Sequence, residues 1–339
     1  EFNFEIVFTI FSIIVIIISL DLIFQYFTSY NIIGLEKKTI GASSLFYDEA
    51  VAGSFLQSFG FFSIYKIFMK FEKKTAKNEI IKSLLVSIIS IGIFVSSQRM
   101  PMVVWILFLT FYGMVFYKSK LKSILFSFII LGVFIISFSS TLERKRYFSF
   151  YENANAIFDR SIMVYKTNKD EKKLEEVKID LKKQSLSPIK DGLEFVKGSG
   201  HGNLFGNTIF IWDKNKFLGI GIKNFYNKCA EYKLLRCSTH PHNYYLDVLV
   251  TVGLLGLSVL IIYLFFLTMR SYQCLKIYYV KKEKQKFNLT FIFFINFLMI
   301  FFPLKSSGGF FSTSNIIYII IILVFLNSQI DKKYFKNLI

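Results

Sequence analysis

The sequence predicts an all-α membrane protein, a bundle of about eight transmembrane helices with one long hydrophilic loop outside the membrane. Three observations predict this class. The 339 residues are 53% hydrophobic and only 19% charged, the apolar residues come in long blocks, and the polar residues gather in 141–241. A fraction of 19% aromatic residues excludes a disordered chain. Three cysteines exclude a disulfide scaffold.

Each membrane crossing needs about 20 mostly apolar residues, because a helix rises 1.5 Å per residue through a hydrocarbon core of about 30 Å. We expect spans near 4–24, 50–69, 79–97, 101–117, 121–140, 243–268, 288–304 and 313–328. The domains are then an N-terminal transmembrane part, 1–140, an extracytoplasmic loop, 141–241, and a C-terminal transmembrane part, 242–339. Because the chain begins with Glu1 rather than Met, we expect further helices before it.

The distribution of positive charge predicts the orientation in the membrane. One alternate set of connections holds 18 Lys and Arg. They are Lys66, Lys70, Lys73, Lys74, Lys77, Lys82, Lys118, Lys120, Lys122, Arg270, Lys276, Lys281, Lys282, Lys284, Lys286, Lys332, Lys333 and Lys336. The other short connections hold only Lys37, Lys38, Arg99 and Lys305. Cytoplasmic loops are the positive ones, so the first set should be cytoplasmic and 141–241 extracytoplasmic.

The densest polar cluster is CSTHPHNYYLD, residues 237–247, directly before a long apolar block. Pro241 restricts His240 to extended geometry, so His240 and His242 do not share a helix face. Polar groups beside lipid are costly unless they are paired or line a cavity. Histidine is a general base near neutral pH, but the two residues also suit a helix cap at the membrane interface. A zinc site is incomplete, because no further ligands stand at suitable spacing.

Three charged residues near the outer ends of spans are further candidates. Arg99 stands in the tight turn SSQRMP, and a guanidinium is the preferred partner of phosphate. The alternative is an arginine that reaches toward lipid headgroups. Asp48 and Glu49 offer an acidic pair, and a helix N-terminus explains two carboxylates equally well.

The long loop contains two weaker signals. Gly219 and Gly221, with Asn224 following, form a Gly-x-Gly turn, which alone is a weak phosphate-binding signal. Cys229 and Cys237 are eight positions apart outside the membrane. In an oxidising compartment they form a small disulfide loop, and free thiols are the alternative that stays open.

The stretch THPHNYYLDVLVTVGLLGL resembles the signature of the O-antigen ligase and O-antigen polymerase superfamily. Three other stretches resemble family segments in the same order: SSQRMP, IFIWDKNKFLGIGIKNF and FFPLKSSGGFFSTSN. The resemblance extends from about residue 21 to 325 and is most specific at the histidines.

The resemblance implies a GT-C-like glycosyltransferase at the periplasmic face of the bacterial inner membrane. Such enzymes move a glycan from undecaprenyl pyrophosphate to a hydroxyl of another lipid-linked glycan or of lipid A core, without metal or other cofactor. By this resemblance His242 activates the acceptor, Arg99 holds the donor pyrophosphate, and His240 and Asn243 support the base. Polymerase and ligase are not separated by these motifs.

The sequence departs from the family where a second loop arginine is expected before Trp212. His201 stands there, and Arg160 is the nearest arginine upstream. We expect His201 and Arg160 to contribute to substrate binding, together with Gly219, Gly221 and Asn224 of the loop. We expect the same of Asp48 and Glu49 near the outer end of the second span. The competing functions are a polysaccharide-lipid flippase or transporter and a membrane scaffold. The resemblance implies lipid-linked glycans and membrane lipid as partners, and we expect no nucleic acid.

Overall fold

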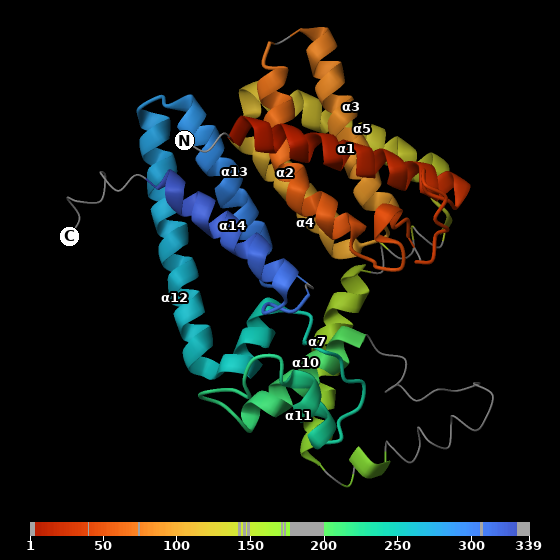
Figure 1. Ribbon diagram of the computed structural model, residues 1–339, viewed down its shortest axis with the longest axis vertical. Coiled ribbons are helices and arrows are strands. Elements are labelled where there is room, and N and C mark those ends of the chain that lie inside the picture. The colour runs from red at the N-terminus through yellow and green to blue at the C-terminus, as the bar shows by residue number, and fades with distance from the viewer. Residues whose placement is uncertain are drawn as a thin grey trace. The chain divides into compact units, whose positions relative to one another are not determined.

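The structure is a computed structural model that describes residues 4–330, apart from 40, 74, 142–143, 145–146, 148–149, 171, 173, 177–199 and 306–307. Regular structure in these residues is helical, with a single isolated bridge between Tyr30 and Glu36. The long helices of Figure 1 are α1 (Phe4–Thr28), α2 (Ala52–Lys70), α3 (Ala76–Val95), α4 (Arg99–Val115), α5 (Tyr117–Phe138), α7 (Phe150–Lys169), α10 (Gly200–Asp213), α12 (Tyr244–Val280), α13 (Lys284–Ile300) and α14 (Thr313–Gln329). The short ones are η1 (Ser44–Phe46) and α11 (Phe225–Glu231). The predicted all-α class is confirmed.

A helix stands at each of the eight predicted spans. Four are long and apolar enough to cross a membrane, over Glu5–Thr28, Ala76–Val95, Lys120–Phe138 and Tyr244–Val280. Two shorter apolar helices cover Arg99–Val115 and Asn315–Gln329. The chain is thus a polytopic helical membrane protein.

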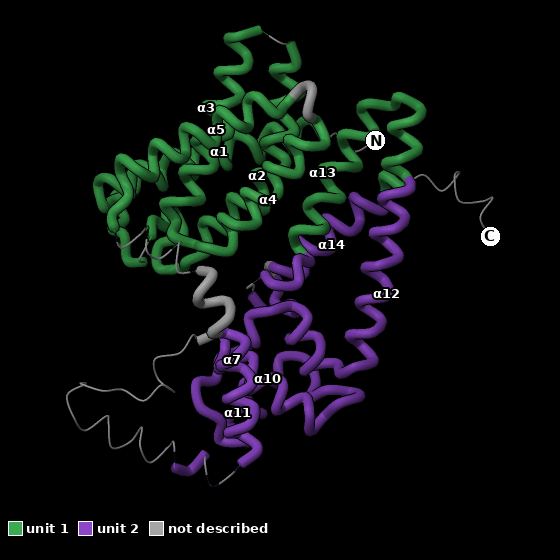
Figure 2. Tube along the Cα trace, turned by 180° about the vertical axis from the view of Figure 1, so that it is seen from behind, with its two compact units in different colours: residues 1–148, 274–300, 328–339 green, residues 149–273, 301–327 purple. Residues whose placement is uncertain are grey.

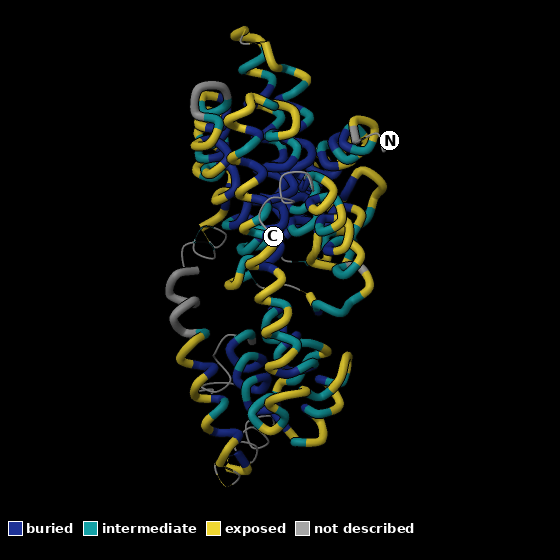
Figure 3. The backbone as a smooth tube through the Cα atoms, turned by 90° about the vertical axis from the view of Figure 1, so that its left-hand side faces the viewer, coloured by how far each residue is buried: buried dark blue, intermediate teal, exposed yellow. Residues whose placement is uncertain are grey.

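The surface of the spanning helices is apolar, as contact with lipid requires. On α1 the exposed side chains include Ile10, Ile17 and Phe24, whereas Ser19 and Gln25 are buried. On α12 the exposed positions include Val259 and Phe265. Outward apolar and inward polar residues reverse the pattern of a water-soluble helix. Figure 3 shows buried and exposed positions alternating along the helices.

The chain forms two compact units, drawn in two colours in Figure 2, and each is described by itself. Unit 1 comprises 1–148, 274–300 and 328–339, and unit 2 comprises 149–273 and 301–327. Unit 1 therefore contains α1 to α5 and α13, while unit 2 contains α7, α10, α11 and most of α12 and α14. The predicted division at 140 and 241 stays a prediction.

The core of unit 1 is built around Trp105 of α4, which is fully buried. Its ring stacks on Phe61 of α2 with centroids 5.7 Å apart, and its Nε1 donates to Ser90 Oγ of α3 at 2.8 Å. Gly60 of α2 lets the indole approach, because a Cβ there would lie 2.8 Å from it. Small residues at such contacts bring membrane helices close together.

The connections of unit 1 separate into two ends. At one end, the α2–α3, α4–α5 and α12–α13 connections line a common cavity, and Glu5 of α1 pairs with Lys66 of α2. At the other end, Ala42 N donates to Val95 O at 2.9 Å and Ser54 N to Gln98 Oε1 at 3.0 Å. Alternate connections therefore lie together, as successive crossings require. The end with the lysine-rich connections is called the basic end below. Lys74, Lys332, Lys333 and Lys336 lie outside the described residues.

In unit 2, α7 and α10 pack closely through two glycines of α10. A Cβ at Gly202 would lie 2.7 Å from Arg160 Cγ, and one at Gly206 would lie 2.6 Å from Val164 Cβ. Only glycine at both positions allows this approach. Beside this pair, Ile211, Phe225, Cys229 and other buried side chains form the apolar core of the unit.

Candidate active site

The three histidines of the chain converge within unit 2. His240 and His242 stand immediately before α12, and their ring centroids are 4.3 Å apart. The ring of His201, near the start of α10, meets that of His242 edge-on at 5.5 Å. His242 has a positive φ of 60°, and the chain bends between Pro241 and the helix. Residues 40 positions apart thus form one imidazole cluster.

His240 is a neutral imidazole at neutral pH. Burial, and secondarily the charge of His242, lower its pKa from 6.5 to about 4. Its Nδ1 lies 2.9 Å from Thr239 Oγ1. Its Nε2 is buried and has no hydrogen-bond partner among the described residues. This nitrogen therefore has hydrogen-bonding capacity that the described residues do not use.

Asn243 holds the histidine segment in place through two kinds of contact. Its side-chain oxygen accepts from Tyr245 N at 3.0 Å and Leu246 N at 3.2 Å, which caps the first turn of α12. Its amide nitrogen donates to Pro303 O at 2.8 Å and Lys305 O at 3.3 Å. The residue thus ties the histidines to the 301–311 loop.

Asp247 makes a second connection to the same loop. Its carboxylate is buried and accepts from Phe310 N at 2.7 Å. Gly309 fits between this carboxylate and His240, because a Cβ there would lie 3.4 Å from the imidazole and 3.6 Å from Asp247 Oδ2. The two contacts hold Gly309 and Phe310 beside the imidazole cluster.

Arg160 contacts α10, the helix that carries His201. The side chain is buried on α7, and its Nε donates to Asn203 Oδ1 of α10 at 3.0 Å. Asn203 is two residues after His201, and Gly202 between them packs on the arginine stem. A buried guanidinium in the same unit as the histidines suits an anionic group.

Sequence reasoning missed Asn203 and its neighbours on α10. Asn203 is buried, and its Nδ2 has no hydrogen-bond partner among the described residues. One turn later, Asn207 accepts from Asn168 Nδ2 of α7 at 2.8 Å and donates to Leu235 O at 2.8 Å. The signal was available in GNLFGN, where Gly-x-x-x-Gly and Asn-x-x-x-Asn coincide on one helix face.

The Gly219–Gly221 turn has a backbone role at a break in α12. Gly253 has φ 71° and ψ −170°, which interrupts the helix. Ile220 N and Gly221 N donate to the carbonyls of Val250 and Thr251 at 2.9 and 2.8 Å, and Gly219 N donates to Asn215 O. These amides are engaged with the protein itself. Substrate binding by the turn, or by Asn224, which donates to Ile220 O, stays a prediction.

Cys229 and Cys237 form a disulfide with Cα atoms 6.1 Å apart. This bond settles the alternative that the sequence left open. It closes the loop that leads from α11 to the histidines, and Cys229 is fully buried in the apolar core of unit 2.

The remaining candidates belong to unit 1. Arg99 is the first residue of α4 and is half-buried. Asp48 and Glu49 are exposed in the connection before α2. Their participation in a site with the histidines stays a prediction. In the part of the chain that the structure describes, no group of three His, Cys, Asp or Glu side chains is suited to hold a metal.

The described residues thus combine a helical membrane fold with three clustered histidines and a buried arginine in unit 2. The family model for O-antigen ligase matches residues 84–261, just over half of the chain. The chain belongs to the O-antigen ligase family. No curated protein and no solved structure matches it significantly.

Membership makes the chain a glycosyltransferase-type enzyme of the O-antigen ligase and polymerase kind, acting on lipid-linked glycans. The matched region contains Arg99, Arg160 and the three histidines. It ends within α12 and so excludes the 301–311 loop that Asn243 and Asp247 hold.

Proposed function

We propose that the protein transfers a glycan from undecaprenyl pyrophosphate to an acceptor hydroxyl during surface polysaccharide assembly. The observation that carries the proposal is the cluster of His201, His240 and His242 in the unit that also buries Arg160. The acceptor is the hydroxyl of a second lipid-linked glycan or of lipid A core.

The reaction needs a base and a cation rather than a new activating group, because the donor already carries a good leaving group. His242 takes the proton of the acceptor hydroxyl while the hydroxyl oxygen bonds to the anomeric carbon of the donor. The bond from that carbon to the pyrophosphate oxygen breaks, and undecaprenyl pyrophosphate leaves. Arg160 stabilises the negative charge on the departing group, and a role for Arg99 stays a prediction.

The neutral state of His240 favours His242 as the base. A second, uncharged imidazole 4.3 Å away accepts or donates a hydrogen bond without repelling the imidazolium that forms. His240 Nε2 is then available to a sugar hydroxyl. Asn243 acts as a positioning residue, because its bonds go to backbone groups.

Two observations support a periplasmic location for this chemistry. The lysine-rich connections gather at one end of unit 1, as the positive-inside rule requires of cytoplasmic loops. The disulfide in unit 2 suits an oxidising compartment. The site then faces the compartment in which lipid-linked glycans are polymerised or ligated.

The test is a reconstituted assay in which purified protein receives a lipid-linked glycan and released undecaprenyl pyrophosphate is measured. We expect His242→Gln to lower turnover by about 10²–10⁴, the usual contribution of a general base. Arg160→Lys should weaken turnover strongly, whereas Arg236→Lys, on an exposed loop position of the same unit, should not. Full activity of His242→Gln in well-folded protein contradicts the proposed base, and glycan translocation without release of pyrophosphate indicates a flippase.

The flippase alternative requires broken helices that expose backbone groups to a cargo. The break at Gly253 is the relevant feature of α12. Its backbone groups are occupied, because Leu254 N donates to Lys216 O at 2.8 Å and Thr251 O accepts from Gly221 N. The break therefore serves packing of the loop, which favours the enzyme.

A further inference from the structure

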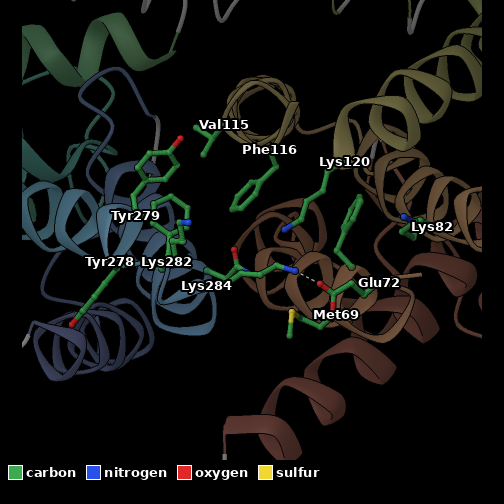
Figure 4. Close-up of a pocket in the computed structure, with 13 residues that line it drawn as sticks. Met69, Glu72, Lys82, Val115, Phe116, Lys120, Tyr278, Tyr279, Lys282 and Lys284 are labelled. Carbon is green, nitrogen blue, oxygen red and sulfur yellow. Dashed lines mark hydrogen bonds and ion pairs between the residues drawn. The ribbon is translucent and has the colours of Figure 1, made fainter. Parts of the chain in front are cut away.

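A cavity of about 550 Å³ lies at the basic end of unit 1 (Figure 4). Its walls come from the end of α2, the start of α3, the α4–α5 junction and the α12–α13 junction. The lining combines aromatic side chains with lysines. It consists of Phe68, Met69, Glu72, Lys82, Val115, Phe116, Lys120, Tyr278, Tyr279, Lys282, Lys284, Phe287 and Asn288. The glycosyl transfer proposed above uses none of these residues.

Positive charge exceeds negative charge around this cavity. Four lysines line it against a single carboxylate, Glu72. Lys284 pairs with Glu72, and Lys82 pairs with Glu79 of its own helix. Lys284, by hydrogen bond and charge, lowers the pKa of Glu72 below its ordinary value, so this group stays ionised. Two ammonium groups, those of Lys120 and Lys282, remain without a carboxylate within 4 Å in the part of the chain described.

Lys120 is held inside the cavity by aromatic rings. Its Nζ lies 3.7 Å from the centroid of Phe116, 4.4 Å from that of Tyr112 and 5.5 Å from that of Phe68, and it donates to Tyr112 Oη. Figure 4 shows Lys120 and Lys284 directed into the same space. Attraction to aromatic ring faces offsets only part of the hydration that a buried cation loses. A half-buried ammonium beside other ammonium groups favours a bound anion.

Asn288 provides an independent sign of a ligand. Its side chain is 4% exposed, it lines the cavity, and its Oδ1 has no hydrogen-bond partner among the described residues. A buried acceptor without a donor destabilises the protein unless a ligand supplies the donor. The ligand should therefore carry a hydrogen-bond donor as well as negative charge.

The cavity adjoins exposed surface at the ends of two helices. Val115 and Tyr279 line it and are 41% and 74% exposed, at the ends of α4 and α12. An acyl chain can continue along this apolar surface while a headgroup occupies the basic interior. Basic pockets between transmembrane helices on the cytoplasmic side are a recognised setting for anionic headgroups.

We propose that this cavity binds the glycerophosphate headgroup of an anionic phospholipid from the leaflet at the basic end of unit 1. The phosphodiester oxygens accept hydrogen bonds from Lys120 and Lys282. A headgroup hydroxyl donates to Asn288 Oδ1. A lipid with a choline headgroup lacks both the net negative charge and the donor, so the cavity discriminates against it.

Lipid binding to the purified full chain in detergent tests the proposal, with affinities measured by native mass spectrometry. The probes are phosphatidylglycerol, phosphatidic acid, phosphatidylcholine and water-soluble glycerol 3-phosphate. We expect phosphatidylglycerol to bind best. The double variant Lys120→Gln/Lys282→Gln should lose about tenfold or more in affinity, equivalent to about 1.4 kcal/mol. Lys122→Gln/Lys281→Gln, which alters neighbouring lysines outside the cavity, is the matched control and should bind as the unaltered protein does.

Asn288→Leu separates the two recognition elements. It should remove the preference for phosphatidylglycerol over phosphatidic acid while anionic lipids still bind. Equal affinity for phosphatidylcholine, equal losses in both double variants, or full competition by glycerol 3-phosphate would overturn the proposal. The unfolding midpoint of each variant without added lipid verifies that the fold is intact, and turnover of lipid-linked glycan is scored separately.

Discussion

Substitution of Gly202 by alanine tests how the α7–α10 contact positions Arg160. The new Cβ would lie 2.7 Å from Arg160 Cγ, 2.8 Å from its Cβ and 3.1 Å from the carbonyl oxygen of Ile157. Carbon atoms prefer about 3.5–4.0 Å, so the overlap is close to 1 Å at the rigid base of the arginine. Overpacking of this kind costs about 1–3 kcal/mol, and the better helix propensity of alanine returns less than about 1 kcal/mol.

Gly132→Ala and Gly206→Ala are the matched controls. At Gly132 of α5 a Cβ meets nothing within 4 Å, so only the helix-propensity gain of about 0.5–1 kcal/mol acts and the unfolding midpoint should rise. At Gly206 the Cβ meets Val164 and Ser161 instead of Arg160. Gly206→Ala should therefore lower stability as Gly202→Ala does, while glycan transfer at a permissive temperature falls only for Gly202→Ala.

The assay combines thermal unfolding in detergent with release of polyprenyl pyrophosphate below the unfolding range. A Gly202→Ala protein with unaltered midpoint and turnover refutes the close contact. Equal losses of turnover in Gly202→Ala and Gly206→Ala refute the specific role of Arg160, because the effect then follows helix packing alone.

Three further outcomes follow from the site. Cys237→Ser should lower the free energy of unfolding by about 2.5 kcal/mol, the loop-entropy value for a separation of eight residues, and reductant should have the same effect on the native protein because it frees Cys229. Because the pKa of His240 is lowered to about 4 in the folded protein, the unfolded chain binds more protons between about pH 4 and 6.5. The free energy of unfolding therefore rises with pH across this window, and its contribution from His240 is complete above pH 6.5 and lost toward pH 4. His240→Gln should flatten the change of unfolding midpoint across the same window. Asn243→Ala removes a helix cap and two bonds to loop carbonyls and should cost about 2–3 kcal/mol, whereas Asn224→Ala, which removes no cap bond, should cost less in the same unfolding experiment.

Hydropathy located the spanning helices because lipid acts on each segment separately. A segment such as 79–97 must satisfy its backbone hydrogen bonds within itself and cover them with apolar side chains, so its composition alone reveals it. The gathering of lysine-rich connections at one end of unit 1 follows from the same local rule, applied to alternate loops. These features depend on the solvent rather than on partners elsewhere in the chain.

The site depends on contacts that no local pattern reports. Nothing near Asn243 indicates that its amide reaches Pro303 and Lys305, sixty residues later. The apolar block after the histidines contains both Gly253 and Gly256, and the break falls at Gly253 because the Gly219 turn packs there. The histidine motif could be recognised from its residues, but its neighbours could be assigned only once the elements had packed.

In the interior of unit 2, some buried polar groups bond to one another and others have hydrogen-bonding capacity that a substrate can use. Asn168, Asn207 and the Leu235 carbonyl satisfy one another at the α7–α10 contact. Two buried atoms in the described residues nearby do not: the Nδ2 donor of Asn203 and the Nε2 of His240. Each unsatisfied group destabilises the folded state by about 1–3 kcal/mol. Such a group is kept where a ligand supplies the missing partner.

The chemistry of those two atoms matches the two halves of the proposed reaction. The amide N–H of Asn203 stands beside Arg160, where an anionic phosphate oxygen can accept from both. The neutral ring nitrogen of His240 stands beside His242, where a sugar hydroxyl can bond to one imidazole and lose its proton to the other. If Asn203→Ala left donor binding unchanged while His240→Gln reduced it, the assignment of the two halves would be reversed, and binding of the donor and acceptor measured separately in the two variants decides between them.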